Sequence, residues 1–210
     1  MIHPKPLLKR GIFLDRDGTL NRDDGYVYKV EDLELLPNVV AGLQQLTGLG
    51  YELIVTTNQS GIARGYFTEA EMHAFNRALC ERLEHAEVRI AAVYYCPFHP
   101  TAGIGPYRRE STFRKPQCGM LLMASAERGI DLRASFAIGD KSSDIVAGRN
   151  AGCRTILLAG QLSQAELKQA APDFVAHDMP DAARFVEQST RRRLSGELAP
   201  NPAAIYSRAG

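Results

Sequence analysis

Short apolar runs alternate along this chain with longer segments whose apolar positions repeat at helical spacing. The apolar runs predict strands at 11–15, 52–56, 92–96, 135–138, 154–158 and 174–176. Strands that alternate with helices are typical of a parallel sheet with helices packed on its faces. The hydrophobic pattern therefore predicts an α/β protein with a doubly wound parallel sheet.

The segments between these runs predict helices with recognisable ends. Four are expected: after Pro37, from Thr68, over about 119–128, and from about Ser142. Thr68 and Glu71 have the spacing of a capping box, in which each residue satisfies a backbone N–H of the first turn. Gly129 is placed to end the third helix in a left-handed conformation. No internal repeat interrupts this order.

Composition limits the organisation of the chain. With 210 residues and 45% hydrophobic content, the chain can bury one core, which we assign to residues 1–188. After about Glu187 the apolar content falls, and three arginines precede a segment containing Gly196, Pro200 and Pro202. We therefore expect residues 189–210 to form a mobile tail, with the arginine run as a solvated helix end.

Charge and cysteine usage exclude several functional classes. The formal net charge is +1, which gives no bulk attraction to nucleic acid or to a membrane surface. The four cysteines are scattered without a Cys-x-x-Cys pair, as expected for reduced thiols in a cytosolic protein. No signal sequence or membrane span is apparent. We expect a cytoplasmic monomer with no nucleic-acid or membrane partner.

Two carboxylates stand where the first predicted strand meets a glycine turn. Asp15 and Asp17 are two residues apart, so on a strand they would share one face. Carboxylates held that close are costly unless a cation or a proton lies between them, so the pair is a candidate for metal binding and acid/base chemistry. An ordinary Asp-Gly turn would explain Asp17 and Gly18, but not an acid directly after an apolar strand.

Other polar groups follow the ends of later strands. Thr57 and its neighbours follow the second strand, and the run from Asp140 to Asp144 follows a later one. Arg114 and Lys115 precede a helix, where cations are unfavourable unless an anion binds nearby. Because ligand sites in open parallel sheets lie at the carboxyl ends of the strands, these groups should converge. Together they suit phosphoryl transfer with Mg²⁺.

These segments resemble the four motifs of the haloacid dehalogenase superfamily of phosphohydrolases. The motifs are the DxDGT run from Asp15, the strand-end Thr57, Lys115, and the GDKxxD run that contains Asp140 and Asp144. Singly each is weak, but their order and spacing make coincidence improbable. Segments 23–27, 57–65, 94–97 and 114–116 are similar to the branch that contains heptose bisphosphate phosphatases and histidinol phosphatases. No connection between motifs is long enough for a large cap domain.

The resemblance implies specific roles. Asp15 would be the nucleophile that forms an aspartyl-phosphate, and Asp17 the general acid and base. Mg²⁺ would be held by Asp15, the main-chain carbonyl of Asp17, and Asp140. Asp144 would not bind the metal directly but would orient Lys115 or a metal-bound water. The phosphate-binding residues would be Thr57, Asn58 and Lys115. The substrate-binding residues would be Asp23, Asp24, Gly25, Tyr26, Gln59, Ser60, Arg64, Arg114 and Lys141, although for Arg64 a loop-stabilising role is an equal alternative.

The implied substrate is a phosphorylated sugar, D-glycero-D-manno-heptose 1,7-bisphosphate, cleaved at its 7-phosphate during the synthesis of nucleotide-activated heptose. Histidinol phosphate or another small phosphomonoester is the alternative within the class. A phospho-acceptor signalling domain is the alternative from another class, because it also places acids and a lysine at the ends of a parallel sheet. Asp17 disfavours it, since an adjacent acid/base hydrolyses the acyl phosphate that a signalling domain must keep.

The sequence departs from this branch at a metal-binding loop. Members of the branch carry a Cys-x-His and a Cys-x-Cys pair, whereas the matching positions here are Cys96, Phe98, Ser111 and Phe113. A structural zinc site needs four nitrogen or sulfur ligands, and only Cys96 remains. We therefore expect no structural zinc, with aromatic packing and the nearby prolines stiffening the loop.

Overall fold

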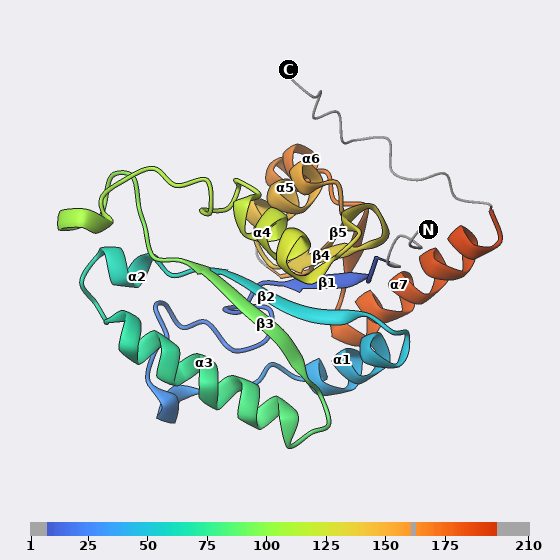
Figure 1. The fold of residues 1–210 in the computed structure, drawn as a ribbon, viewed down its shortest axis with the longest axis horizontal. Helices are drawn as coiled ribbons and strands as arrows, with labels where there is room; N and C mark the ends of the chain where they lie inside the picture. Colours follow the sequence, from blue (N-terminus) through green and yellow to red (C-terminus); the bar gives the residue numbers. More distant parts are fainter. Residues whose placement is uncertain (1–7, 161–162, 197–210) are drawn as a thin grey trace, which may run out of the picture.

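A computed structural model describes residues 8–160 and 163–196. It contains a six-stranded, all-parallel sheet in the order β3-β2-β1-β4-β5-β6 (Figure 1). The strands are β1 (Gly11–Leu14), β2 (Glu52–Asn58), β3 (Ile90–Cys96), β4 (Phe136–Gly139), β5 (Arg154–Leu158) and β6 (Phe174–Ala176). All six strands predicted from the apolar runs are confirmed, and so is the doubly wound parallel sheet.

Helices cover both faces of this sheet. They are α1 (Val39–Gly48), α2 (Ser60–Ala63), α3 (Glu69–Glu84), α4 (Gly119–Arg128), α5 (Ser142–Ala151), α6 (Gln164–Ala170) and α7 (Met179–Leu194). Short 3-10 turns lie at Val30–Asp32, Gly105–Tyr107 and Leu132–Ala134. The four predicted helices are present as α1, α3, α4 and α5. The predicted ends are also confirmed, because Thr68 and Glu71 form a reciprocal capping box and Gly129 ends α4 with φ 69°.

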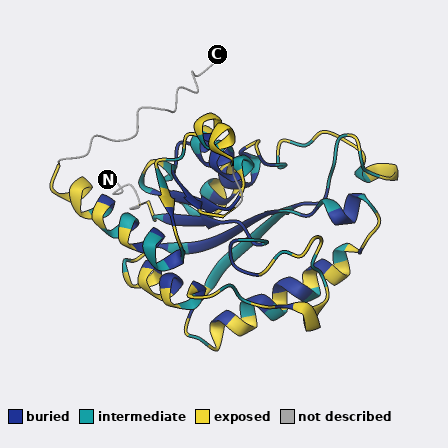
Figure 2. Cartoon of the chain, turned by 180° about the vertical axis from the view of Figure 1, so that it is seen from behind, coloured by how far each residue is buried: buried dark blue, intermediate teal, exposed yellow. Residues whose placement is uncertain are grey.

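The core has two main layers. On one face, α1, α3 and α7 pack on the apolar side chains of the central strands, and on the other face α4 and α5 do so, with α6 beside α5. Figure 2 shows the central strands buried between helices whose outward faces are exposed, whereas the edge strand β3 is half-buried along most of its length. Burial on both faces explains why the strands read as continuous apolar runs. All four cysteines are free thiols, and three of them are buried.

The order of the strands fixes where a ligand can bind. Chain progression reverses between β1 and β4, which are neighbours in the sheet although far apart in sequence. Loops that leave these two strands turn to opposite faces, and a crevice opens at their carboxyl ends. Across residues 8–160 and 163–196, no helix is long and apolar enough to cross a membrane.

The C-terminal boundary differs from the expected one. The mobile tail was expected from residue 189, but α7 continues to Leu194. Ser189 is buried, and the Thr190 hydroxyl lies 2.7 Å from the Tyr51 hydroxyl. The sequence favoured a tail because this end of α7 is polar on most of its surface, and few apolar positions mark its packed face. Residues 189–194 belong to the folded domain, and residues 197–210 lie outside the described part of the chain.

Close packing of α7 on α1 yields a stability prediction. A Cβ atom on Gly42 of α1 would lie 2.5 Å from the main-chain carbon of Met179 at the start of α7. We expect Gly42→Ala to lower the free energy of unfolding by about 1–3 kcal/mol, because overpacking forces the two helices apart. Urea unfolding, with an unchanged m-value, measures this.

Gly48→Ala is the matched control, because Gly48 is exposed on the same helix with open space around it. It should stabilise the protein by about 0.5–1 kcal/mol through helix propensity. Equal effects of the two substitutions would contradict the packing of α1 on α7.

Candidate active site

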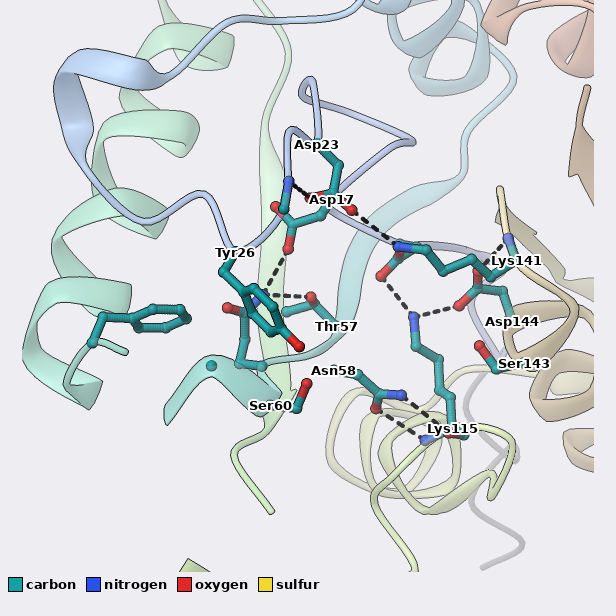
Figure 3. Close-up of a pocket in the computed structure, with 15 residues that line it drawn as sticks. Asp17, Asp23, Tyr26, Thr57, Asn58, Ser60, Lys115, Lys141, Ser143 and Asp144 are labelled. Atoms are coloured by element: carbon teal, nitrogen blue, oxygen red, sulfur yellow. Dashed lines mark hydrogen bonds and ion pairs between the residues drawn. The ribbon is translucent and has the colours of Figure 1, made fainter. Parts of the chain in front are cut away.

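A pocket of about 290 Å³ lies at the carboxyl ends of the strands, where the chain order reverses. Asp15 follows β1, Thr57 is the last residue but one of β2, and the loop after β4 leads into α5. Figure 3 shows the side chains that converge there from these segments and from the loop before α4. The pocket is lined by Asp15, Asp17, Asp23, Gly25, Tyr26, Thr57, Asn58, Gln59, Ser60, Gly61, Phe67, Lys115, Lys141, Ser143 and Asp144.

Lys115 is the centre of the pocket floor. Its ammonium lies 2.7 Å from Asp15 Oδ1 and 2.6 Å from Asp144 Oδ1, and it donates a hydrogen bond of 2.7 Å to the carbonyl of Thr56. Lys115 is 4% exposed, and both carboxylates are buried. Burial alone would lower the pKa of Lys115, but the charges of Asp144 and Asp15 outweigh it and raise the pKa. Lys115 therefore stays charged.

Three carboxylates lie close together here, and two of them pair with this ammonium. In the part of the chain that the structure describes, oxygens of Asp15, Asp140 and Asp144 lie within 4.8 Å of one another. Burial, and then the charge of Asp15, raise the pKa of Asp140 to about 7. Burial likewise raises the pKa of Asp15, although Lys115 opposes this. A hard divalent cation would relieve this repulsion, and oxygen ligands are those that Mg²⁺ prefers.

Asp144 is already engaged by protein groups. Its Oδ1 pairs with Lys115, and its Oδ2 accepts the main-chain N–H of Lys141 at 3.0 Å, where it caps α5. Asp15 and Asp140 are therefore the acids best placed to hold a cation, while Asp144 fixes Lys115. Gly18 lies against Asp140, since a Cβ atom at Gly18 would collide with its carboxylate. The tight turn of the first motif thus brings the main chain at Gly18 into close contact with the acidic cluster of Asp15, Asp140 and Asp144.

Asp17 takes no part in that cluster. Its carboxylate accepts N–H bonds from Arg16 at 2.9 Å on both oxygens, from Asn21 at 3.1 Å and from Gln59 at 2.8 Å. The two acids of the first motif border one pocket, but they have different partners. The like-charge conflict expected between Asp15 and Asp17 is therefore resolved by separate cations, Lys115 and Arg16.

Two residues expected to contact substrate are occupied by internal hydrogen bonds. The side-chain amide of Asn58 donates to the Lys115 carbonyl and accepts the Lys115 N–H, both at 3.0 Å. Gln59 donates from Nε2 to Asp17 and to the hydroxyl of Thr57, the latter at 2.9 Å. Both residues line the pocket, yet their side chains position Lys115 and Asp17. Figure 3 shows Asn58 beside Lys115.

The mouth of the pocket is polar and aromatic. Lys141 pairs with Asp23 at 3.2 Å across the opening, and Tyr26 and Ser60 lie beside it (Figure 3). Tyr26 is 43% exposed and has φ 59°, a left-handed conformation that follows Gly25 at φ 93°. A non-glycine residue in this region is uncommon and marks a constrained loop.

Three expected substrate residues do not line the pocket. Asp24 pairs with Arg22 at 2.9 Å on the surface. The Arg114 guanidinium donates to the carbonyl of Phe98 at 3.2 Å. The Arg64 guanidinium carbon lies 5.8 Å from the ring centroid of Tyr26, so this residue contacts the mouth through that ring.

Sequence reasoning missed Arg16, Gly61, Phe67 and Ser143. Gly61, Phe67 and Ser143 carry no pattern of their own and reach the pocket through the fold. The sequence did contain a signal for Arg16. A cation placed between two functional acids inside a buried motif needs an anionic partner, and this indicates a role in the site. It was overlooked because an arginine next to a turn usually faces solvent.

A doubly wound sheet without a large cap, with this set of acids and one buried lysine, is the architecture of the haloacid dehalogenase-like hydrolases. A family model described as HAD-hydrolase-like matches residues 112–182, from the loop before Lys115 into α7. A solved structure of D,D-heptose 1,7-bisphosphate phosphatase from B. bronchiseptica, complexed with magnesium and phosphate, superposes with a TM-score of 0.74 at 29% identity. The match covers 87% of this chain and 99% of that one.

Curated relatives show to which family within this superfamily the chain belongs. The chain is 38% identical over 182 residues to D-glycero-beta-D-manno-heptose-1,7-bisphosphate 7-phosphatase of Salmonella typhi, covering 86% of this chain and 96% of that protein. It is 46% identical over 149 residues to D-glycero-alpha-D-manno-heptose-1,7-bisphosphate 7-phosphatase of Burkholderia mallei. This match covers 71% of this chain and 79% of that protein. The chain therefore belongs to the D-glycero-D-manno-heptose-1,7-bisphosphate 7-phosphatase family, and it is a phosphatase.

The crowded carboxylates yield a prediction about metal-free protein. The pKa of Asp140 is raised in the folded state, so the folded protein binds its proton more tightly than the unfolded chain does. In chelator, stability should fall as the pH rises from about 4, the ordinary carboxyl value, towards 7. Asp140→Asn should flatten this decline and raise stability above that of the wild type at pH 8.

Thermal unfolding with chelator and with Mg²⁺ measures both effects. Mg²⁺ should stabilise the wild type by mass action and Asp140→Asn much less. Asp24→Asn is the control, because Asp24 is an exposed carboxylate paired with surface Arg22. Equal stabilisation of wild type and Asp140→Asn by Mg²⁺ would contradict the assignment of Asp140 as a ligand.

Proposed function

We propose that this phosphatase hydrolyses the 7-phosphate of D-glycero-D-manno-heptose 1,7-bisphosphate through an aspartyl-phosphate intermediate. The observation that carries the mechanism is the buried contact of 2.7 Å between the Lys115 ammonium and Asp15, at the floor of a pocket open to a phosphate. The activities for which the curated relatives are named support this substrate. The product would feed the synthesis of nucleotide-activated heptose in the cytoplasm.

The reaction divides into two transfers. First, an Asp15 oxygen attacks phosphorus, the bond from phosphorus to the C7 oxygen breaks, and Asp17 donates a proton to that leaving oxygen. Then water attacks the phosphorus of the aspartyl-phosphate while Asp17 accepts its proton, and Asp15 and inorganic phosphate are released. Asp15 needs no activating base, because a carboxylate held beside Lys115 is a nucleophile when ionised.

The charge of the phosphoryl group needs fixed cations and donors. Lys115 and the Thr57 hydroxyl face the position that its oxygens would occupy, where preorganised donors stabilise charge that develops in the transition state. Asn58 contributes by holding the main chain of Lys115. Mg²⁺, held by Asp15, Asp140 and the main-chain carbonyl of Asp17, would reduce the repulsion between the nucleophile and the phosphate.

The sugar would be recognised at the mouth. Asp23, Gly25, Tyr26, Ser60 and Lys141 lie around the opening. Arg64 and Arg114 do not line the pocket, but they would supply positive charge to a distal phosphate that extends beyond its mouth. The names of the relatives include both the alpha and the beta anomer, so the anomer is a matter for experiment. Histidinol phosphate is the second candidate, because its phosphate ester would meet the same pocket floor.

A direct substrate comparison tests this proposal. We expect kcat/KM for a heptose 1,7-bisphosphate anomer to exceed that for histidinol phosphate, because the second phosphate can pair with cations at the mouth. Phosphorus NMR would report loss of the 7-phosphate signal with the glycosyl 1-phosphate retained. Asp15→Asn should abolish turnover and serves as the control for contaminating phosphatases. A clear preference for histidinol phosphate would overturn the substrate assignment and leave the mechanism intact.

We also propose that the loop before Lys115 is held without zinc. The Arg109 guanidinium carbon lies 3.7 Å from the ring centroid of Phe98, so a cation stacks on the residue that stands at one of the ligand positions of the branch. The ring centroids of Phe98 and Tyr107 are 6.1 Å apart, and the Tyr107 hydroxyl donates to Glu69 of α3 at 2.7 Å. Ring packing and this hydrogen bond support a loop stiffened by protein groups.

Metal analysis of protein purified without chelator checks this proposal. We expect less zinc than would fill a site on each chain, and no loss of thermal stability after treatment with a zinc chelator. Tyr107→Phe should lower the unfolding temperature, because it removes the hydrogen bond to Glu69, worth about 1 kcal/mol. One tightly bound zinc per chain would contradict the proposal.

A further inference from the structure

Arg16 separates the two acids of the first motif, and its side chain is buried, with 1% exposed. The guanidinium donates Nε–H to Asp17 Oδ1 and Nη2–H to Asp17 Oδ2, both at 2.9 Å. Such a two-point contact fixes the orientation of a carboxylate as well as its distance. Asp17 is therefore held by the residue that precedes it.

Arg16 is itself anchored on α3. Its Nη1 donates to Asn76 Oδ1 at 2.8 Å, and its guanidinium carbon lies 4.5 Å from the ring centroid of Phe75. Its Nη2 also faces the carbonyl of Val27 at 3.1 Å and Gln59 Oε1 at 3.2 Å. Phe75 and Asn76 are buried on a helix of 16 residues. The orientation of Asp17 thus depends on a rigid element rather than on its own turn.

The surroundings of Asp17 keep it away from the neighbouring acids. Each of its oxygens accepts two N–H bonds, from Arg16 and Asn21 on Oδ1 and from Arg16 and Gln59 on Oδ2. Among the described residues, the carboxylates that cluster are Asp15, Asp140 and Asp144, although Asp17 is only two residues from Asp15. A carboxylate without these donors could turn towards any nearby cation.

We propose that Arg16 is a positioning residue for Asp17. It holds the acid on the wall of the pocket, apart from the acid cluster. Once Asn21 or Gln59 releases its contact to make room for a proton, Asp17 can pass that proton to the leaving oxygen instead of binding a cation. This inference rests on the proposed role of Asp17 as general acid and base. Arg16 does not line the pocket, and it acts through its contacts with the Asp17 carboxylate.

The test uses the dependence of kcat/KM on the leaving group, with full-length protein and Mg²⁺. A series of phenyl phosphates with phenols of rising pKa, extended by an alkyl phosphate, reports the first transfer, because kcat/KM covers the steps up to departure of the alcohol. Asp17→Asn should lower kcat/KM for the alkyl phosphate by about 10²–10⁴-fold. It should change little for the most acidic phenol, which leaves without a proton.

Arg16→Met should give the same selective pattern, with a loss for the alkyl phosphate of about 10–100-fold, as is typical for residues that orient a functional group. Arg16→Lys should recover part of this loss, since an ammonium supplies charge but not the two-point contact. The affinity for Mn²⁺, measured by electron paramagnetic resonance without substrate, should stay unchanged.

Two further variants separate positioning from folding. Asn76→Ala loosens Arg16 from α3 without touching Asp17 and should show a smaller loss with the same selectivity. Asn76→Ala also tests the proposal if Arg16→Met fails to fold. Arg154→Met removes another arginine packed on an aromatic ring, 4.8 Å from the centroid of Phe185, far from the pocket. It should leave the leaving-group dependence unchanged.

Three outcomes would overturn the proposal. One is an equal loss in Arg16→Met for aryl and alkyl phosphates, and another is no loss in either Arg16→Met or Asn76→Ala. The third is a loss of Mn²⁺ affinity in Arg16→Met that matches the loss of kcat/KM, because Arg16 would then support the metal site. If Asp17→Asn itself lacks the selective loss, the acid/base role of Asp17 fails first, which distinguishes the two failures.

Discussion

The rest of the site depends on one buried ammonium, that of Lys115. It holds Asp15 after β1, Asp144 at the start of α5 and the carbonyl of Thr56 in β2. A buried charge without partners would cost several kcal/mol, so these contacts fix the relative positions of three chain segments. The carboxylates in turn could not be buried together without this cation. The constraint that allows the pocket to form is therefore also the one that arranges its chemistry.

This constraint also explains why Asp15 and Asp17 have different cationic partners. Two acids two residues apart would repel each other if they shared one environment, but Lys115 neutralises Asp15 while Arg16 neutralises Asp17. Each acid thus acquires its own surroundings: Asp15 among acids that can hold a cation, and Asp17 among N–H donors. Different surroundings allow two identical side chains to take different roles. The sequence shows the pair, whereas only the three-dimensional arrangement shows how the pair is divided.

The sequence predicted the sheet, the four helices α1, α3, α4 and α5, and the convergence of the motifs, because continuous apolar runs and strand-end polar residues are local signals. It could not place Asn58 and Gln59, since an amide that binds a neighbouring backbone looks the same as one that binds substrate. It ended the domain before Ser189, because α7 buries one narrow stripe and exposes the rest. Arg16 was missed for a related reason: burial of a charged side chain depends on Phe75 and Asn76, about 60 residues away.

In the proposed function, the chemistry and the specificity of this protein lie in different parts of the fold. The pocket floor is built from buried charges at strand ends, where a single substitution leaves a partner uncompensated. The mouth is built from loops: Tyr26 packs edge-on against Tyr66 with centroids 4.8 Å apart, and the loop from residue 97 is tied to α3 through Tyr107 and Glu69. Loops tolerate change better than strand ends do. A family with one reaction can therefore change its sugar, its anomer or its metal loop while Lys115, Asp15 and Asp17 keep their positions.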